Sequence, residues 1–203
     1  AKDINACVKD GRYHYGDCAV LYRTNAQSRL FEEKFIVSNI PYKIVGGVNF
    51  YARKEIKDLL AYLKTIDNAR DDLAVRRIIN VPKRGIGATT LNRVADYAAT
   101  ADISFYNALK MADDIPTLGK SAAKIKPFVN FIQVMRSKVE IISVSELLQE
   151  IIDETGYVKE LEAEDTEEAK ARIENIDELI SKVVAYEEGE EHPTLSGFLE
   201  EVA

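Results

Sequence analysis

The sequence predicts a mainly α-helical protein that carries a small α/β segment at its N-terminus. Two short apolar runs that suit buried strands, residues 18–22 and 41–45, fall within the first 47 residues. Beyond Gly47, apolar residues recur at helical spacing and no strand pattern remains. We therefore expect an α/β segment over residues 1–52 and a helical domain over residues 53–203.

The N-terminal segment is expected to run from strand to helix to strand. Residues 18–22 form a continuous apolar run, typical of a buried strand, and a helix follows with Thr24 or Asn25 at its N-cap. The second strand ends at Gly46 and Gly47. Because two strands alone do not form a stable sheet, we expect the other strands to come from sequence outside this chain.

Helix signals account for the rest of the chain. Apolar periodicity predicts helices over these segments: 54–66, 73–79, 88–98, 104–111, 121–139, 167–186 and a short final one after Pro193 and Thr194. Ser143 and Glu146 form a capping box at the start of a further helix, and Gly156 ends it.

The turn at residues 81–90 carries the strongest functional signal. It reads Val-Pro-Lys-Arg-Gly-Ile-Gly-Ala-Thr-Thr, a pattern that predicts a helix-hairpin-helix-like element. Pro82 ends the first helix, and the glycines let a phosphate approach the backbone at the start of the second. The expected duplex or phosphate contacts are Lys83, Arg84, Gly85, Ile86, Gly87, Ala88, Thr89 and Thr90. The turn alone equally allows a plain helical hairpin with solvated cations.

The charge of the chain is divided between its two parts. Residues 1–145 carry 23 Lys and Arg against 15 Asp and Glu, whereas residues 146–203 carry 4 against 19. No acidic residue occurs from Leu73 to Ala95. A polyanion is therefore expected to approach the first part and to be repelled by the second.

Two further groups are candidates for contact with nucleic acid. Tyr22, Arg23, Thr24 and Asn25 lie where a predicted strand meets a helix, a place where α/β sheets bind ligands. Arg53 and Lys57, one helical turn apart, could face one phosphate track. An ordinary strand end with an N-cap, and a solvated first turn, explain the same residues.

Other apparent motifs are rejected. Gly119-Lys120-Ser121 resembles the end of a phosphate-binding loop, but Asp114 occupies the position of its first glycine. The acidic runs 160–168 and 187–191 suit solvated surface. With 46% hydrophobic and 30% charged residues, two cysteines and two histidines, the chain suits a globular cytoplasmic protein. We expect no catalytic residue, metal site or membrane segment in it.

Four segments in this order resemble the UvrD/Rep/PcrA type of superfamily 1 DNA helicases, most strongly its PcrA branch. The segments are AVLYRTNAQSR at 19–29, PYKIVGG at 41–47 with FY at 50–51 and RKEIKD at 53–58, IINVPKRGIG at 78–87, and RIEN at 172–175 followed by Glu178 and Leu179. They span nearly the whole chain, and the first three are specific at this length and spacing.

The resemblance implies a role for each part. Residues 1–52 would belong to the second RecA-like domain (2A), and residues 53–203 would form most of the helical 2B domain. Arg23 and Asn25 would contact single-stranded DNA, and the glycine turn would grip the duplex ahead of the fork. Asn49 lies where relatives often have Lys or Arg, so a DNA contact there would be weaker or absent.

The resemblance also implies an ATP- and magnesium-dependent 3′–5′ helicase acting in DNA repair and replication, with regulatory protein partners. Its ATPase motifs are absent from this chain: there is no GxxxxGK[ST] and no acidic metal-binding motif after a strand. We expect the isolated chain to need no cofactor and not to hydrolyse ATP. The rival interpretation is a helical protein-interaction module whose hairpin is purely structural.

Overall fold

The computed structural model describes residues 1–45 and 47–203, and the regular elements among these residues are all helical. The α-helices are α1 (Lys2–Lys9), α2 (Ser28–Val37), α3 (Lys54–Asp67), α4 (Asp72–Ile78), α5 (Ala88–Ala101), α6 (Phe105–Lys110), α7 (Ala122–Lys138), α8 (Val144–Thr155), α9 (Tyr157–Glu164), α10 (Glu167–Gly189) and α11 (Leu195–Glu201). Short 3-10 helices include η2 (Asn25–Gln27) and η3 (Phe50–Ala52).

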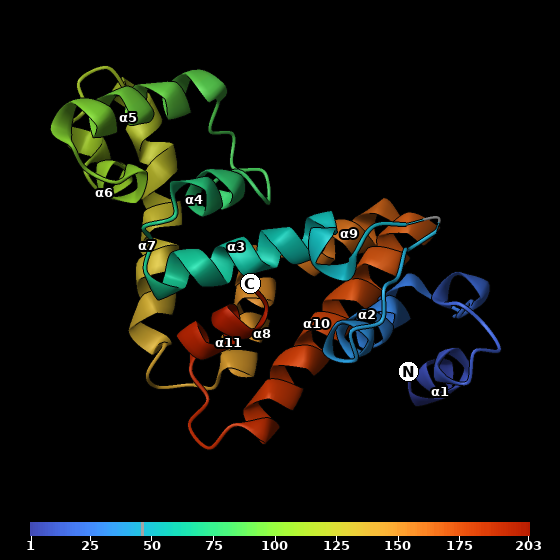
Figure 1. The fold of residues 1–203 in the computed structure, drawn as a ribbon. Coiled ribbons are helices and arrows are strands. Elements are labelled where there is room, and N and C mark those ends of the chain that lie inside the picture. Colours follow the sequence, from blue (N-terminus) through green and yellow to red (C-terminus); the bar gives the residue numbers. More distant parts are fainter. Residues whose placement is uncertain (46) are drawn as a thin grey trace.

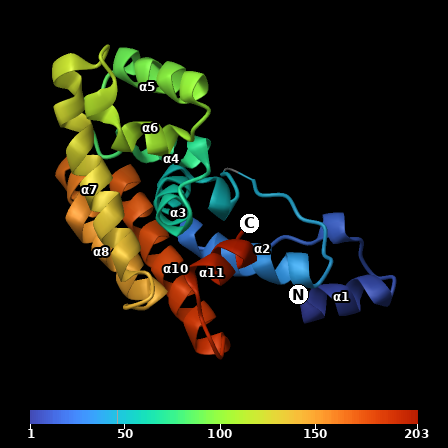
Figure 2. The ribbon, with the colours of Figure 1, turned by 90° about the vertical axis from the view of Figure 1, so that its left-hand side faces the viewer.

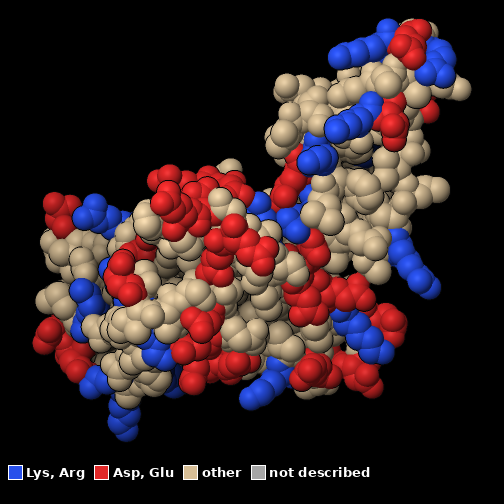
Figure 3. Space-filling model, turned by 90° about the horizontal axis from the view of Figure 1, so that it is seen from below, with Lys and Arg blue, Asp and Glu red and all other residues tan. Residues whose placement is uncertain are grey.

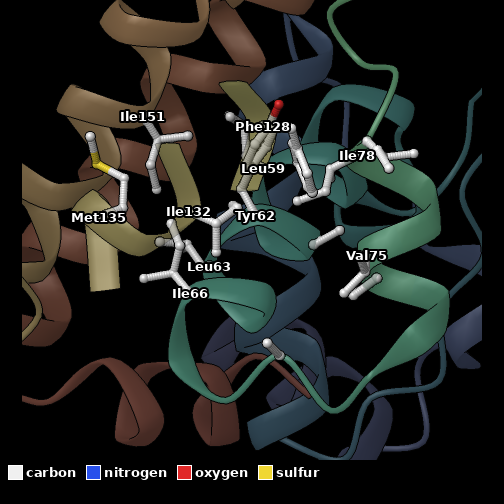
Figure 4. Close-up of a cluster of buried hydrophobic side chains, with 14 of the residues drawn as sticks. Leu59, Tyr62, Leu63, Ile66, Val75, Ile78, Phe128, Ile132, Met135 and Ile151 are labelled. Atoms are coloured by element: carbon white, nitrogen blue, oxygen red, sulfur yellow. The ribbon is translucent and has the colours of Figure 1, made fainter. Parts of the chain in front are cut away.

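Helix α3 is the centre of the packing. It lies against α4, α7, α8, α10 and α11, and most of its residues are buried. Figure 4 shows Leu59, Tyr62 and Leu63 of α3 among side chains from α4, α7 and α8. Since α3 is covered on several sides, its apolar residues are not confined to a single stripe.

A buried carboxylate ties three helices together. Asp58 of α3 is 1% exposed, and it accepts hydrogen bonds from Arg77 of α4 at 2.7 Å and from the Tyr157 hydroxyl of α9 at 2.8 Å. Lys54 adds an ion pair at 2.8 Å. Burial and the nearby Asp58 raise the pKa of Tyr157 far above its usual value, so its hydroxyl remains a donor. The negative charge of Asp58 is buried, and its partners offset the free-energy cost of removing it from water.

The predicted helices after residue 53 are confirmed, with one omission. Their counterparts are α3, α4, α5, α6, α7, α8, α10 and α11. The capping box is present, because Ser143 Oγ accepts from the Glu146 amide at 3.2 Å and Glu146 accepts from the Ser143 amide at 2.9 Å. Helix α9 was missed, since its acidic residues suggested solvated surface, yet Tyr157 and Leu161 are buried.

The two predicted N-terminal strands are not formed. Residues 18–22 and 41–45 have no strand assignment, and both line a cavity of about 810 Å³ beside α2. An extended segment becomes a strand only when another backbone pairs with it, and such a partner is absent among the described residues. The predicted α/β segment therefore contains helices α1 and α2, and the two segments that flank α2 are unpaired. Gly46, expected at the end of the second strand, lies outside the described residues.

The predicted tight hairpin of helices also differs from the structure. α4 already ends at Ile78, so Pro82 lies within a loop rather than at the helix end. That loop, residues 79–87, joins α4, which packs on α3 and α6, to α5, which packs on α6. Figures 1 and 2 show α4, α5 and α6 at one end of the molecule and the C-terminal part of α10 at the other.

Candidate nucleic-acid interface

The loop at 79–87 is held in shape by one amide side chain. Asn80 donates from Nδ2 to the carbonyl of Ile86 at 2.8 Å. Its Oδ1 accepts from the backbone amides of Arg84 at 2.8 Å and Ile86 at 3.4 Å. Ile86 is buried at 1% exposure and anchors the loop in the core. The backbone between these anchors is therefore fixed in position rather than left to solvent.

Arg84, predicted as a phosphate contact, directs its guanidinium inward to groups of the protein itself. Its Nη1 lies 2.9 Å from the carbonyl of Ile78 and within 3.4 Å of three further carbonyls in the loop. Its Nη2 donates to the Tyr62 hydroxyl at 2.6 Å, and Tyr62 in turn donates to Val81 O at 2.6 Å. The guanidinium also lies over the Phe128 ring, 5.3 Å from its centroid. These contacts engage the guanidinium N–H donors that a phosphate contact would use.

The outward side of the loop presents open backbone. Gly85 has φ +68°, a conformation that favours glycine, and no atom lies within 4 Å of a Cβ built on Gly87. Gly87 is also the N-cap of α5 and provides no side-chain cap for its first amides. The amides at the start of α5, from Ala88 to Thr90, therefore lie at an exposed helix N-terminus that suits an anion.

Two lysines flank this backbone. Lys83 is exposed and forms no ion pair with any described residue. Lys124, on the exposed side of α7, donates to the carbonyl of Gly85 at 3.2 Å. No local pattern in the sequence indicates Lys124, because it lies 39 positions further along the chain than Gly85. The loop thus gathers positive charge from two separate elements.

The other cations of the acid-free window have different surroundings. Arg77 is paired with Asp58, and Arg76 lies over the Phe105 ring, 4.5 Å from its centroid. Arg93 donates to the Thr117 carbonyl at 2.6 Å and remains exposed. Figure 3 shows acidic side chains gathered over much of the opposite, lower side of the molecule. A polyanion is therefore favoured at the loop end and disfavoured on the lower side.

The predicted single-strand contacts lie at the start of η2. The side chains of Arg23 and Asn25 are exposed, and Tyr22 stacks on Phe31 with ring centroids 5.8 Å apart. Thr24 occupies the N-cap position without a side-chain capping bond. The structure brings these four residues together but places them away from the loop at 79–87, beside α10.

Arg53 and Lys57, predicted as a possible phosphate track, differ in exposure. Arg53 is 8% exposed, and it donates to Asn175 Oδ1 at 2.6 Å and to the Asn25 carbonyl at 2.7 Å. Asn175 donates in turn to Glu55 at 2.6 Å. Lys57 alone remains exposed. Arg53 therefore joins η2, α3 and α10 instead of meeting solvent.

In residues 1–45 and 47–203, no cluster of three or more His, Cys, Asp or Glu is arranged to hold a metal ion. Within the same ranges, no helix has the length and apolar character needed to cross a membrane.

Comparison with known proteins decides the family. The sequence pattern of the UvrD-like helicase C-terminal domain matches residues 1–203. The chain belongs to this family. It is 45% identical over its whole length to the ATP-dependent DNA helicase PcrA of Bacillus subtilis, and 44% identical over its whole length to PcrA of Staphylococcus epidermidis. PcrA of Staphylococcus aureus is 45% identical over 93% of the chain.

Membership of the UvrD-like helicase C-terminal family confirms the resemblance drawn from the four sequence segments, and the mainly helical fold agrees with it. The chain spans 28% of the length of the B. subtilis and S. epidermidis relatives and 26% of the S. aureus protein. The relatives' activity is thus an activity of much longer chains.

Proposed function

We propose that this chain is a DNA-binding and regulatory segment of an ATP-dependent DNA helicase, and that the loop at 79–87 grips duplex DNA by its backbone. The observation that carries the proposal is the outward side of this loop. There, Lys83 and Lys124 flank exposed glycines and the uncapped start of α5. Such donors bind phosphate without reading bases.

The arrangement of the core supports a division into two domains near residue 52. The main apolar core begins at Phe50 and runs to Leu199, whereas Ala26 and Ile40 are the buried apolar residues of the described part before it. Residues 1–52 are then a piece of the RecA-like 2A domain, and residues 53–203 are most of the 2B domain.

We assign single-stranded DNA to the start of η2. The exposed side chains of Arg23 and Asn25 supply a charge-assisted donor and an amide there. Tyr22 is packed against Phe31, and Thr24 is half-buried. These two residues therefore hold the site in shape rather than stack on a base. DNA at a single-strand/duplex junction would then contact both the η2 region and the loop.

The ATPase chemistry belongs to the longer protein. We propose that full-length relatives of this chain use ATP and magnesium for 3′–5′ unwinding, in repair and replication. The chain itself contains no GxxxxGK[ST] sequence to cradle a nucleotide. Its part is then to hold DNA while the motor moves.

Binding of the 203-residue chain to unrelated duplex sequences, measured by fluorescence anisotropy at several salt concentrations, tests the proposal. We expect similar affinity for each sequence and a steep loss of affinity as salt rises, because phosphate contacts release counterions. Affinity that depends on sequence, or is insensitive to salt, contradicts it.

The acidic surface favours a second candidate, a protein-interaction module. Residues 146–203 carry 19 acidic against 4 basic residues, which suits docking of a basic regulatory partner. Under this alternative the loop is only structural, and duplex DNA is not bound in a salt-dependent way.

A further inference from the structure

A second cationic site lies at the other end of α4 from the loop. A pocket of about 250 Å³ opens between the α3–α4 link, α6 and α7. Three cations line it, one from each of these elements: Arg70, Lys110 and Arg136. The pocket is several times larger than the volume of about 30 Å³ that one water occupies in the liquid.

The remaining lining groups are hydrogen-bonding side chains. Asn68, Asn107 and Gln133 contribute amides. Polar groups from three elements converge here, as they do in small-ligand sites.

The pocket also contains a buried polar group without a partner. Tyr106 lines it and is 4% exposed, and its hydroxyl has no hydrogen-bond partner within the described chain. Buried hydroxyls are rarely left unpaired, because the loss of water costs free energy that a hydrogen bond would restore. Burial raises the pKa of Tyr106, and Arg136 opposes this rise, so the two side chains are electrostatically coupled.

The positive charge of the pocket is not neutralised by neighbouring carboxylates. Arg70, Lys110 and Arg136 form no ion pair with any residue that the structure describes. Two carboxylates are next in sequence to the lining residues. Asp67 accepts hydrogen bonds from Asn68 at 3.0 Å and Ser196 at 2.5 Å, and Asp71 accepts one from the Ala74 amide at 3.0 Å. Three cations without an ion-pair partner, beside amide donors, suit an anion.

We propose that this pocket binds a phosphate group, held by Arg70, Lys110 and Arg136. The guanidinium groups suit paired phosphate oxygens, and Lys110 adds a point charge. Two sources share this chemistry: free inorganic phosphate, and the phosphate backbone of bound DNA. The pocket is separate from the loop at 79–87. The experiment can therefore contradict the phosphate pocket without contradicting the proposed duplex contact, and the reverse.

Titration of the intact 203-residue chain with inorganic phosphate, against chloride at equal ionic strength, tests the pocket by calorimetry and amide NMR. We expect saturable binding with signal changes confined to α6, the α3–α4 link and the middle of α7. Arg136→Gln should weaken binding by about tenfold, the loss expected for one charge-assisted contact. The matched control Lys64→Gln, an exposed lysine of α3 outside the pocket, should leave it unchanged.

Tyr106→Phe gives a second readout that does not depend on removing charge. It should weaken phosphate binding while the melting temperature without phosphate stays the same or rises, because an unpaired hydroxyl is removed. No saturable phosphate binding, or equal binding by wild type and Arg136→Gln, overturns the proposal.

The source of the phosphate is decided by the same variants with DNA. If Lys110→Gln and Arg136→Gln lower both phosphate binding and the salt slope of duplex binding, the DNA backbone occupies the pocket. If phosphate binding falls and duplex binding does not, the pocket takes a free phosphate. Both results uphold a phosphate site.

Discussion

Lys83 and Arg84 are adjacent cations with opposite surroundings. Lys83 points to solvent, whereas the Arg84 guanidinium is bound to loop carbonyls and to Tyr62. The two residues look equivalent in the sequence, because a local pattern does not show which side chain lies next to backbone carbonyls in the fold. Variants of the two residues therefore separate the proposed DNA contact from loop stability.

Arg84→Ala is expected to destabilise the fold. It removes a charged donor from several carbonyls, at a cost of about 2 kcal/mol, and should lower Tm by roughly 4–8 °C. Thermal melting by circular dichroism measures this, with Lys83→Ala as the matched control that leaves Tm unchanged. Equal melting of both variants would show that the inward contacts of Arg84 contribute nothing.

At the scale of elements, the capping box of α8 should give pH-dependent stability. Hydrogen bonds with Ser143 hold the pKa of Glu146 below its usual value. A depressed folded pKa stabilises the fold above the unfolded pKa, and this stabilisation is lost as pH falls through the folded value. Urea unfolding of wild type and Glu146→Gln from pH 7 to pH 3 should converge at the acidic end. A difference that stays constant with pH would refute this account.

The junction of η2, α3 and α10 should behave as one coupled unit. Arg53 is bonded to Asn175, which is bonded to Glu55, and all three are buried. Because the groups share partners, Arg53→Ala and Asn175→Ala should be non-additive, with a coupling energy of roughly 0.5–3 kcal/mol. A double-mutant cycle from urea unfolding measures it, and strict additivity would show that the contacts are independent.

Features that depend on residues close together in the sequence could be predicted, and features that depend on distant residues could not. Helices such as α3 and α10 were predictable because their apolar spacing is local, and the Ser143 cap because it spans three residues. The strands were wrong because pairing needs a partner outside the described residues. The contacts of Arg53 and Lys124 could not be predicted, because they span 122 and 39 positions.

At the scale of the whole molecule, the chain should bind DNA without turning over ATP. Nucleotide phosphates need a GxxxxGK[ST] loop or an equivalent cradle, and the sequence lacks that motif. A coupled ATPase assay of the purified chain, with and without duplex DNA, should remain at the buffer baseline. DNA-stimulated hydrolysis that survives further purification would contradict the assignment of the ATPase to the longer protein.

The division of charge gives the molecule one face that suits the proposed binding of DNA. The loop at 79–87 lies at the end with α4 and α5, and acidic side chains spread over the lower side. Variants that remove the same amount of charge from these two faces should therefore affect DNA binding differently.

The most direct test of the central claim compares two charge-matched double variants in duplex binding. Lys83→Ala/Lys124→Ala removes two cations at the loop, and Lys159→Ala/Lys170→Ala removes two exposed cations from the acidic part. Fluorescence anisotropy across a salt series should show weaker binding of the loop variant to every sequence, with a log–log salt slope smaller by about 2. The control variant should keep the wild-type slope. An unchanged slope in the loop variant, or equal effects of both variants, would contradict a phosphate grip at this loop.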